Sequence, residues 1–318
     1  MDQTLPPPPS GASESTPGPV ACKRHPDVQT MLRCTRCGDP ICPECMQPAA
    51  VGYQCPSCAR GSRQEVHRPA QRVGTAPGRG LTLTNVILLI LVAMYGVEVW
   101  VGGAGSLIAG PNANVLVRLG ASLGYGCTRS GDAVGIGAGE TYRLFTAIFL
   151  HAGLIHLAMN GYALWAFGNI VEAELGKTRF LVIFIVGGLF ASVASYTFGA
   201  AVVPGVGASG AIFAVFGAFV GYSWRRRDLA FYAARIRNAV VLIVITAVFS
   251  LSVPGIDWRA HAGGFAAGLL MGLAADGLGD RRSAWVTFLV SAVVLVVVGT
   301  LAVQSHTATL QALYGAVC

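Results

Sequence analysis

The sequence has 318 residues, of which 53% are hydrophobic and only 12% are charged, and its mean hydropathy is +0.59. A soluble domain of this size carries far more charge, so the composition favours a polytopic membrane protein with a soluble attachment. The net charge of +7 does not indicate a nucleic-acid partner, because the arginines lie beside apolar spans and form no stripe interleaved with aromatic residues. The high content of Ala, Gly, Val and Arg is typical of a GC-rich bacterial genome.

Two segments near the N-terminus are expected to have no fixed structure. Residues 1–21 are rich in Pro, Ser and Gly and lack the apolar core of a signal peptide, which predicts a disordered cytoplasmic tail. Residues 59–80 are rich in Arg, Pro and Gly and are typical of a flexible basic linker lying against an anionic inner leaflet.

Four pairs of metal-ligating residues lie between these segments, and two residues separate the members of each pair. The pairs are Cys22 and His25, Cys34 and Cys37, Cys42 and Cys45, and Cys55 and Cys58. Eight such ligands predict two structural Zn²⁺ ions in tetrahedral sites. A disulfide framework is the alternative, but it needs an oxidising compartment and does not explain four identical spacings. We expect a cross-brace, in which the first and third pairs share one ion and the second and fourth the other; sequential pairing is the alternative.

Seven apolar stretches predict transmembrane helices, at about residues 81–101, 154–173, 180–199, 207–224, 239–253, 260–278 and 284–303. Arg and Lys concentrate before the first stretch and in the loops after the second, fourth and sixth, so these loops face the cytoplasm if the spans alternate. We therefore expect a multi-pass protein of the plasma membrane, with its N-terminus inside and the C-terminal tail, residues 304–318, outside.

This orientation places the cysteine-rich segment in the cytoplasm, where thiols stay reduced. Residues 22–58 resemble a B-box-type zinc finger, which implies a module that binds a cytoplasmic protein partner and performs no catalysis. The long loop from Gly102 to Gly153 is then external and is expected to rest in the outer interface of the bilayer. Cys127 of this loop and Cys318 are both external, so the two can pair.

Three predicted spans carry polar residues at one depth, because the second, fourth and sixth spans all run from outside to inside. Ser209 lies in the first turn of the fourth span and His261 at the start of the sixth, while His156 and Asn160 share one face of the second. Each residue alone has a structural explanation, such as an interhelical hydrogen bond. Together they supply what acyl transfer requires, namely a nucleophile, a base for its proton, and donors for the oxyanion.

The base is expected to act without an acidic partner, as a dyad of Ser209 and His261, because Asp257 falls in the loop before the sixth span. The helices that carry the dyad can pack closely, because small residues line one face of each. These are Gly264, Gly268 and Gly272 behind His261, and Gly210, Ala214, Gly217 and Gly221 behind Ser209.

Over its first six predicted spans the sequence resembles the rhomboid intramembrane serine proteases. The matching motifs are Glu140-x-Tyr142-Arg143, His151-x4-His156-x3-Asn160, Gly207-x-Ser209-Gly210 and Ala260-His261-x2-Gly264-x3-Gly268. Tyr142 stands where the family usually has Trp, and Phe213 where a tyrosine is often seen. A Phe213 ring can still stack on His261, but it offers no phenolic hydroxyl.

The resemblance implies an all-α, rhomboid-like bundle of six helices with one additional C-terminal span, over residues 81–303. It also implies hydrolysis of a peptide bond in or next to a transmembrane helix of another membrane protein. Ser209 would attack, His261 would act as base and then as acid, and Asn160, His156 and the Ser209 amide would hold the oxyanion. Family members use no metal for this chemistry, so zinc is expected in the N-terminal module alone.

Two other functions are weighed against the protease. The first is an inactive rhomboid-like scaffold that recruits partners through the zinc module, and the presence of both Ser209 and His261 argues against it. The second is a transporter or channel, whose polar groups would line a path through the whole bilayer. Glu98 and Glu172, which lie near span ends, are interpreted as interfacial or paired residues.

Overall fold

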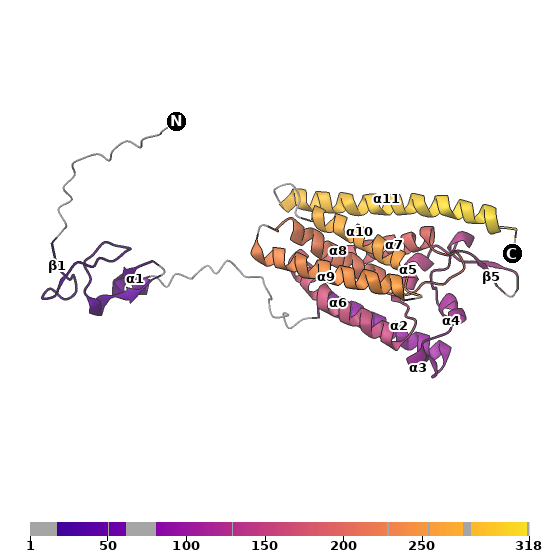
Figure 1. Cartoon of the computed structure of the whole chain (residues 1–318), viewed down its shortest axis with the longest axis horizontal. Helices are drawn as coiled ribbons and strands as arrows, with labels where there is room; N and C mark the ends of the chain where they lie inside the picture. The colour runs from indigo at the N-terminus through magenta and orange to yellow at the C-terminus, as the bar shows by residue number, and fades with distance from the viewer. Residues whose placement is uncertain are drawn as a thin grey trace, which may run out of the picture. The chain divides into compact units, whose positions relative to one another are not determined.

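The computed structural model describes residues 18–49, 51–61, 81–128, 130–227, 229–253, 255–275, 281–316 and 318, and these are mostly helical. They divide into two compact units, one within residues 1–71 and one within residues 72–318 (Figure 1). Most of the predicted N-terminal tail and of the predicted basic linker lies outside the described residues.

The N-terminal unit consists of short hairpins around buried cysteines. Strand β1 pairs antiparallel with β2 and strand β3 with β4, and a 3-10 turn and helix α1 complete the unit. Its buried core holds one isoleucine and four cysteines: Cys22, Cys34, Ile41, Cys42 and Cys45. So small an apolar core cannot stabilise a fold by itself, so the unit requires cross-links through its cysteines. The elements are β1 (Val20–Ala21), β2 (Gln29–Thr30), the 3-10 turn (Pro43–Cys45), β3 (Gln47–Pro48), β4 (Tyr53–Gln54) and α1 (Pro56–Gly61).

Among the described residues, the second unit contains seven long helices, and each overlaps one of the predicted spans. They are α2 (Leu83–Gly102), α6 (Leu154–Leu175), α7 (Lys177–Phe198), α8 (Ser209–Trp224), α9 (Ala230–Ser252), α10 (Trp258–Ala274) and α11 (Arg281–Tyr314). Among the described residues, α2, α7 and α11 are each long and apolar enough to cross a membrane. Residues 143–149 and α6 qualify together as a broken span or a re-entrant loop, with a bend of 91°, whereas α8 is apolar but shorter. The count of six spans plus one stays a prediction.

Helix α8 occupies the centre of this unit, packed against α7, α10 and α6. Twelve of its 16 residues are buried, as expected for a helix that is apolar on all sides. The predicted small faces meet here. A Cβ atom on Gly268 of α10 would overlap the Ala214 carbonyl of α8, and one on Gly217 of α8 would overlap the Phe265 carbonyl of α10. The two helices therefore touch backbone to backbone.

Both buried glutamates of this unit accept backbone hydrogen bonds. The Glu172 carboxylate of α6 accepts the amides of Leu83 and Thr84 at the start of α2, each at 2.9 Å. Glu98, which is fully buried in α2, accepts the amide of His151 at 3.0 and 3.1 Å through its two oxygens. Their interpretation as paired residues is confirmed, and each pairing ties α2 to an end of α6.

The loop between α2 and α6 is folded into small elements. Tyr142, from the predicted loop motif, is 54% exposed and donates its hydroxyl to the Glu140 carboxylate at 3.2 Å. The elements are α3 (Ser106–Ala109), α4 (Ala113–Arg118), β5 (Gly126–Cys127) paired antiparallel with β6 (Ala133–Val134), a 3-10 turn (Ile136–Ala138), α5 (Arg143–Thr146) and a second 3-10 turn (Ala147–Phe149).

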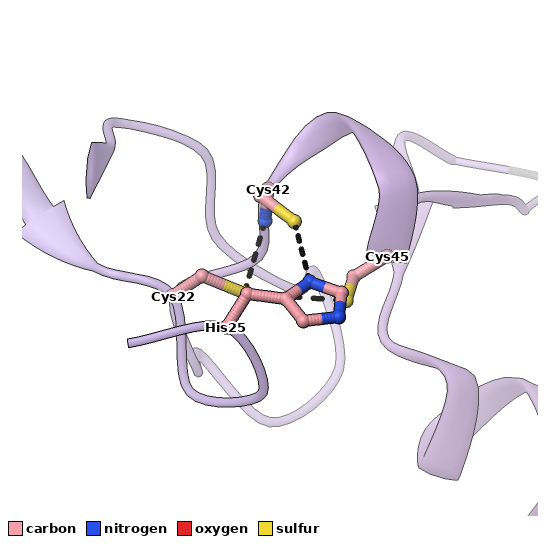
Figure 2. Close-up of side chains that lie close together, drawn as sticks. All are labelled: Cys22, His25, Cys42 and Cys45. Carbon is pink, nitrogen blue, oxygen red and sulfur yellow. Dashed lines mark hydrogen bonds between the residues drawn. The ribbon is translucent and has the colours of Figure 1, made fainter. Parts of the chain in front are cut away.

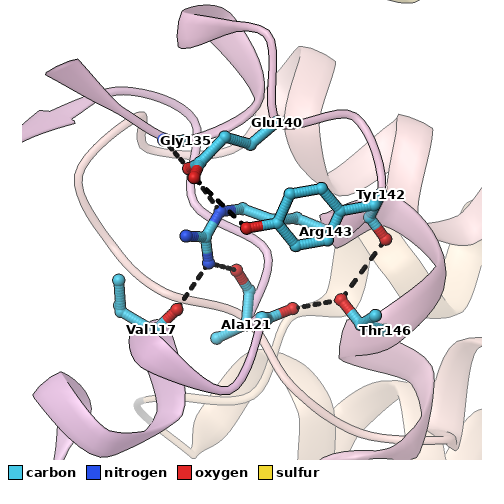
Figure 3. A network of polar contacts seen from close by, with 8 residues as sticks. Val117, Ala121, Gly135, Glu140, Tyr142, Arg143 and Thr146 are labelled. Carbon is cyan, nitrogen blue, oxygen red and sulfur yellow. Dashed lines mark hydrogen bonds and ion pairs between the residues drawn. The ribbon is translucent and has the colours of Figure 1, made fainter.

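Arg143 holds this loop together from within (Figure 3). Its buried guanidinium donates to the carbonyls of Val117 and Ala121, at 2.6 and 3.1 Å, and to the Glu140 carboxylate at 2.8 Å. Glu140 also accepts the Gly135 amide, at 2.6 Å. Burial disfavours the ionised form of Glu140, but Arg143 and the Gly135 amide outweigh it, so the pKa of Glu140 lies below its ordinary value.

Helix α11 lies along α7 and α10 and continues past the predicted span end at residue 303 (Figure 1). Beyond that point Leu310 is buried against Tyr125 of the loop, and Cys318 forms a disulfide with Cys127. The predicted boundary between membrane domain and tail therefore falls inside α11.

Replacing Gly268 with alanine should lower the free energy of unfolding by about 1–3 kcal/mol, because the added methyl would meet the Ala214 backbone of the facing helix. Thermal unfolding in detergent measures the effect. Gly96→Ala in α2 is the matched control, since no atom lies within 4 Å of the position of its Cβ. Equal melting temperatures for the two variants would contradict the close approach of α8 and α10.

Replacing Glu140 with glutamine should lower the melting temperature at neutral pH but not at low pH. The folded-state pKa of Glu140 is lowered, so ionised Glu140 stabilises the fold above its unfolded pKa of about 4.5. This contribution disappears as pH falls through the folded-state value. Melting temperatures of wild type and variant should therefore differ by a constant amount above about pH 5 and converge progressively as the pH falls through the lowered folded-state pKa. A difference that does not shrink as the pH is lowered would show that the carboxylate charge is not the cause.

Candidate functional site

Ser209 and His261 are in hydrogen-bonding contact, as the sequence predicts. Ser209 is the first residue of α8, and His261 lies in the first turn of α10. The Ser209 Oγ and the His261 Nε2 are 2.9 Å apart. Both side chains are half-buried, so the pair lies in contact with the surroundings and is not sealed in the core.

The Phe213 ring stacks on the His261 imidazole, with ring centroids 4.3 Å apart and planes inclined by 11°. Phe213 lies one turn after Ser209 on α8, so one helix supplies both the hydroxyl and the ring against the imidazole. The predicted stacking is confirmed, and it needs no phenolic hydroxyl.

Among the described residues, the Asp257 carboxylate makes no hydrogen bond to the His261 imidazole, although the Asp257 carbonyl accepts the His261 backbone amide at 3.3 Å. Its carboxylate caps α10 by accepting the amides of Arg259 and Ala260, at 3.0 and 3.3 Å, and it is hydrogen-bonded to the Ser195 hydroxyl of α7. These contacts explain why Asp257 is unavailable to orient the imidazole, as expected from its place before the sixth span.

Sequence reasoning missed the residue that does contact the other imidazole nitrogen. Ser250, in the last turn of α9, places its Oγ 2.9 Å from the His261 Nδ1, and Ser250 is only 6% exposed. The sequence did contain an indication of this contact, because Ser250 lies near the end of the fifth predicted span. That end is at the same side of the bundle as the start of the sixth span, which carries His261.

His156, in the first turn of α6, lies near Ser209. A Cβ atom on Gly207 would lie 3.0 Å from the His156 Nε2 and 3.7 Å from the Ser209 Oγ, so these two atoms border one small space beside Gly207. Gly207 has a φ of +130°, which disfavours any residue with a side chain, and a side chain would also fill the space. The Ala152 amide donates to the His156 Nδ1 at 3.4 Å, which favours the tautomer with its proton on Nε2.

Asn160 lies one turn further along α6, where it is buried. Its amide nitrogen donates to the His156 carbonyl at 3.0 Å, along its own helix. A side-chain amide has two N–H donors, and this contact uses one of them. His156 therefore lies beside Ser209, and the second N–H donor of Asn160 remains for another acceptor.

The segment before Ser209 is held by the long loop. Ser122 and Gly205 exchange two backbone hydrogen bonds, at 2.9 and 2.7 Å, and the Gly207 amide donates to the Ala147 carbonyl at 2.9 Å. Helix α8 begins directly after this segment, so its first amides, including that of Ser209, have no carbonyl partner within the helix. They are available to an acceptor beside Ser209.

The eight predicted metal ligands gather into two clusters in the N-terminal unit. One contains Cys22, His25, Cys42 and Cys45, and the other Cys34, Cys37, Cys55 and Cys58. Within each cluster the ligand atoms lie within 4.8 Å of one another. The grouping joins the first pair with the third and the second with the fourth, which is the predicted cross-brace.

The distances within the clusters fit tetrahedral coordination. Two thiolates at about 2.3 Å from one zinc ion are about 3.8 Å apart, and the Sγ atoms of Cys22 and Cys45 are 4.0 Å apart. The His25 Nδ1 lies 3.2 Å from the Cys42 Sγ (Figure 2). The Cys42 amide donates to the Cys22 Sγ at 3.3 Å, as amides near metal-bound thiolates do. These residues can hold a metal ion.

The family is shown by sequence similarity. The Rhomboid domain profile matches residues 138–276. "Putative rhomboid protease YdcA" of Bacillus subtilis is 31% identical over 155 residues, which cover 49% of this chain and 77% of that protein. The chain belongs to the rhomboid family.

Two other relatives match over shorter shares of their own length. "Rhomboid protease GluP" of Bacillus subtilis is 40% identical over 162 residues, which are 51% of this chain and 31% of GluP. "RHOMBOID-like protein 1" of Arabidopsis thaliana is 38% identical over 136 residues, 42% of this chain and 34% of that protein. The chain thus spans about a third of the length of these two rhomboid relatives. The range matched by the Rhomboid domain profile, residues 138–276, includes Ser209 and His261.

Proposed function

We propose that this rhomboid protein is an intramembrane serine endopeptidase that cleaves transmembrane segments of other membrane proteins. The contact of 2.9 Å between the Ser209 Oγ and the His261 Nε2 carries the proposal. A serine hydroxyl is a weak nucleophile unless a base accepts its proton, and the imidazole is at hydrogen-bond distance. Relatives that are named rhomboid proteases support the same reaction class.

The first step is attack by Ser209 on the scissile carbonyl. The Ser209 Oγ forms a bond to the carbonyl carbon while its proton passes to the His261 Nε2. The protonated imidazole then gives this proton to the leaving amine, and an acyl-enzyme remains. Water attacks the ester by the same proton route in reverse, which releases the second product and restores Ser209.

Negative charge develops on the carbonyl oxygen during each attack. The space beside Gly207 can receive this oxygen, because the His156 Nε2 and the Ser209 Oγ both border it. With its proton on Nε2, His156 can donate to the oxyanion, and so can the free amides at the start of α8. Asn160 is proposed as a further donor to the oxyanion, through the second N–H of its side-chain amide.

Substrate access follows from the chemistry of the peptide bond in lipid. A carbonyl within an intact helix is hydrogen-bonded and shielded, so the substrate must unwind locally before it can reach Ser209. The half-buried dyad lies at the starts of α8 and α10, at an end of the bundle and not at its middle, where water can reach it. A transporter, by contrast, would need polar groups along the whole bundle.

The orientation of the protein is part of the proposal. Cys127 and Cys318 form a disulfide, whereas the seven cysteines of the N-terminal unit are unpaired by disulfides in the described structure. A disulfide suits an oxidising exterior and free thiols suit the cytoplasm. This supports an N-terminus inside and a C-terminus outside the plasma membrane of a bacterium.

The N-terminal unit is proposed to bind two structural Zn²⁺ ions and to present a docking surface to a cytoplasmic protein partner. Cysteine and histidine in sets of four are typical zinc ligands, and closed sets of this kind stabilise a fold without catalysis. The zinc takes no part in the hydrolysis.

Ser209→Ala and His261→Ala should each lower cleavage by at least about 10³-fold, because either change removes the activated nucleophile. The assay is cleavage of a single-span substrate by the full chain in liposomes. Ser223→Ala is the matched control, since Ser223 is a buried serine on the same helix about 20 Å further along. An inert wild type that also fails to react with serine-directed probes would instead favour the non-proteolytic scaffold.

The purified full chain should contain two zinc ions. The double variant Cys22→Ser with Cys45→Ser should keep one ion, because both residues belong to one cluster of the cross-brace. Cys22→Ser with Cys34→Ser should lose both, since it damages each cluster. Sequential pairing would give the opposite pattern. Cys127→Ser with Cys318→Ser is the control and should keep two ions; zinc per chain is measured by elemental analysis.

A further inference from the structure

We propose that Ser250 is a positioning residue for His261, so that the reactive pair is oriented by a third, uncharged group. The Ser250 hydroxyl oxygen accepts a hydrogen bond from the Nδ1–H group and thereby turns Nε2 to Ser209. This inference rests on the proposed protease function and adds a residue from α9 to it.

The side-chain contacts of His261, which itself lies on α10, come from two other helices. Ser209 of α8 is 2.9 Å from Nε2, Ser250 of α9 is 2.9 Å from Nδ1, and the Phe213 ring of α8 covers one face. Both ring nitrogens and one face are thus occupied by side chains. The imidazole plane is fixed by Phe213, and the rotation of the ring within that plane is fixed by the two hydroxyls.

Proton transfer from Ser209 depends on which ring nitrogen of His261 carries the proton. A neutral imidazole has one N–H donor and one bare acceptor nitrogen. Ser209 can transfer its proton only to an unprotonated Nε2. Nδ1 must therefore carry the ring proton and donate a hydrogen bond to an acceptor. Ser250 supplies an acceptor oxygen at the required distance. A serine within a helix commonly donates its own proton to the carbonyl one turn back, which leaves its lone pairs for Nδ1.

No other described side chain is recorded in contact with Nδ1. Asp257 is occupied as the cap of α10 and as the partner of Ser195. His156 borders the opposite side, next to Ser209. Ser250 is 94% buried, so water does not compete freely for its hydroxyl. A hydroxyl carries no charge, and its contribution is therefore that of one neutral hydrogen bond, smaller than that of a buried carboxylate.

The decisive measurement is the rate at which a fluorophosphonate probe labels Ser209 in the full chain in detergent. Ser250→Ala should lower the labelling rate constant about three- to tenfold while the final labelled fraction stays unchanged. For substrate cleavage, kcat should fall by the same factor with KM unchanged. Ser250→Thr, which keeps the hydroxyl, should restore the rate. Ser252→Ala is the matched control, because Ser252 is an exposed serine on the same helix.

Three outcomes would overturn the inference. Equal labelling rates for Ser250→Ala and Ser252→Ala would show that the hydroxyl does not position His261. A smaller labelled fraction with an unchanged rate constant would show that Ser250 only stabilises the fold. A wild type that is never labelled would remove the proposed protease function and this inference with it, whereas labelling of wild type with no effect of Ser250→Ala would remove this inference alone.

Discussion

The structure depends on the backbone contact between α8 and α10. Glycines on both helices let the main chains touch, and this contact fixes how far Ser209 stands from His261. A separation increased by only about 1 Å would take the pair beyond hydrogen-bond distance. Other contacts refine this arrangement, since the long loop anchors the start of α8 and Asp257 anchors the start of α10. Small residues, which contribute little apolar surface of their own, thus set the position of the polar groups.

Much of this arrangement is readable in the sequence. The helices follow from long apolar stretches, and the contact of Ser209 with His261 follows from equal depth combined with small-residue faces. The two clusters of Cys and His residues follow from four equal spacings. The short chain segments between the pairs can reverse direction, which lets alternate pairs meet in a cross-brace. These predictions succeed because each rests on a local pattern whose period or spacing has one simple geometric solution.

Other features have no local signature. Ser250 resembles any serine in an apolar helix, and its contact with His261 depends on how the turn between α9 and α10 directs the two helices. The polar end of α11 suggests a tail when it is considered alone. The residues that pack against it, around Tyr125, are about 180 residues away in sequence, so the local pattern does not reveal them. Asn160 shares a helical face with His156, yet that pattern does not say whether its amide is directed to the site or along its own helix.

The disulfide between Cys127 and Cys318 closes a covalent ring that contains α5 to α11, and with them Ser209, Ser250 and His261. Helix α2 and the N-terminal unit lie outside this ring. A single break in any connection within the ring would leave the helices that carry Ser209 and His261 joined to the others, so a nicked molecule would not release a fragment. The ring can close only after α11 has been synthesised and has reached the loop, so the bond marks a chain whose last helix is in place.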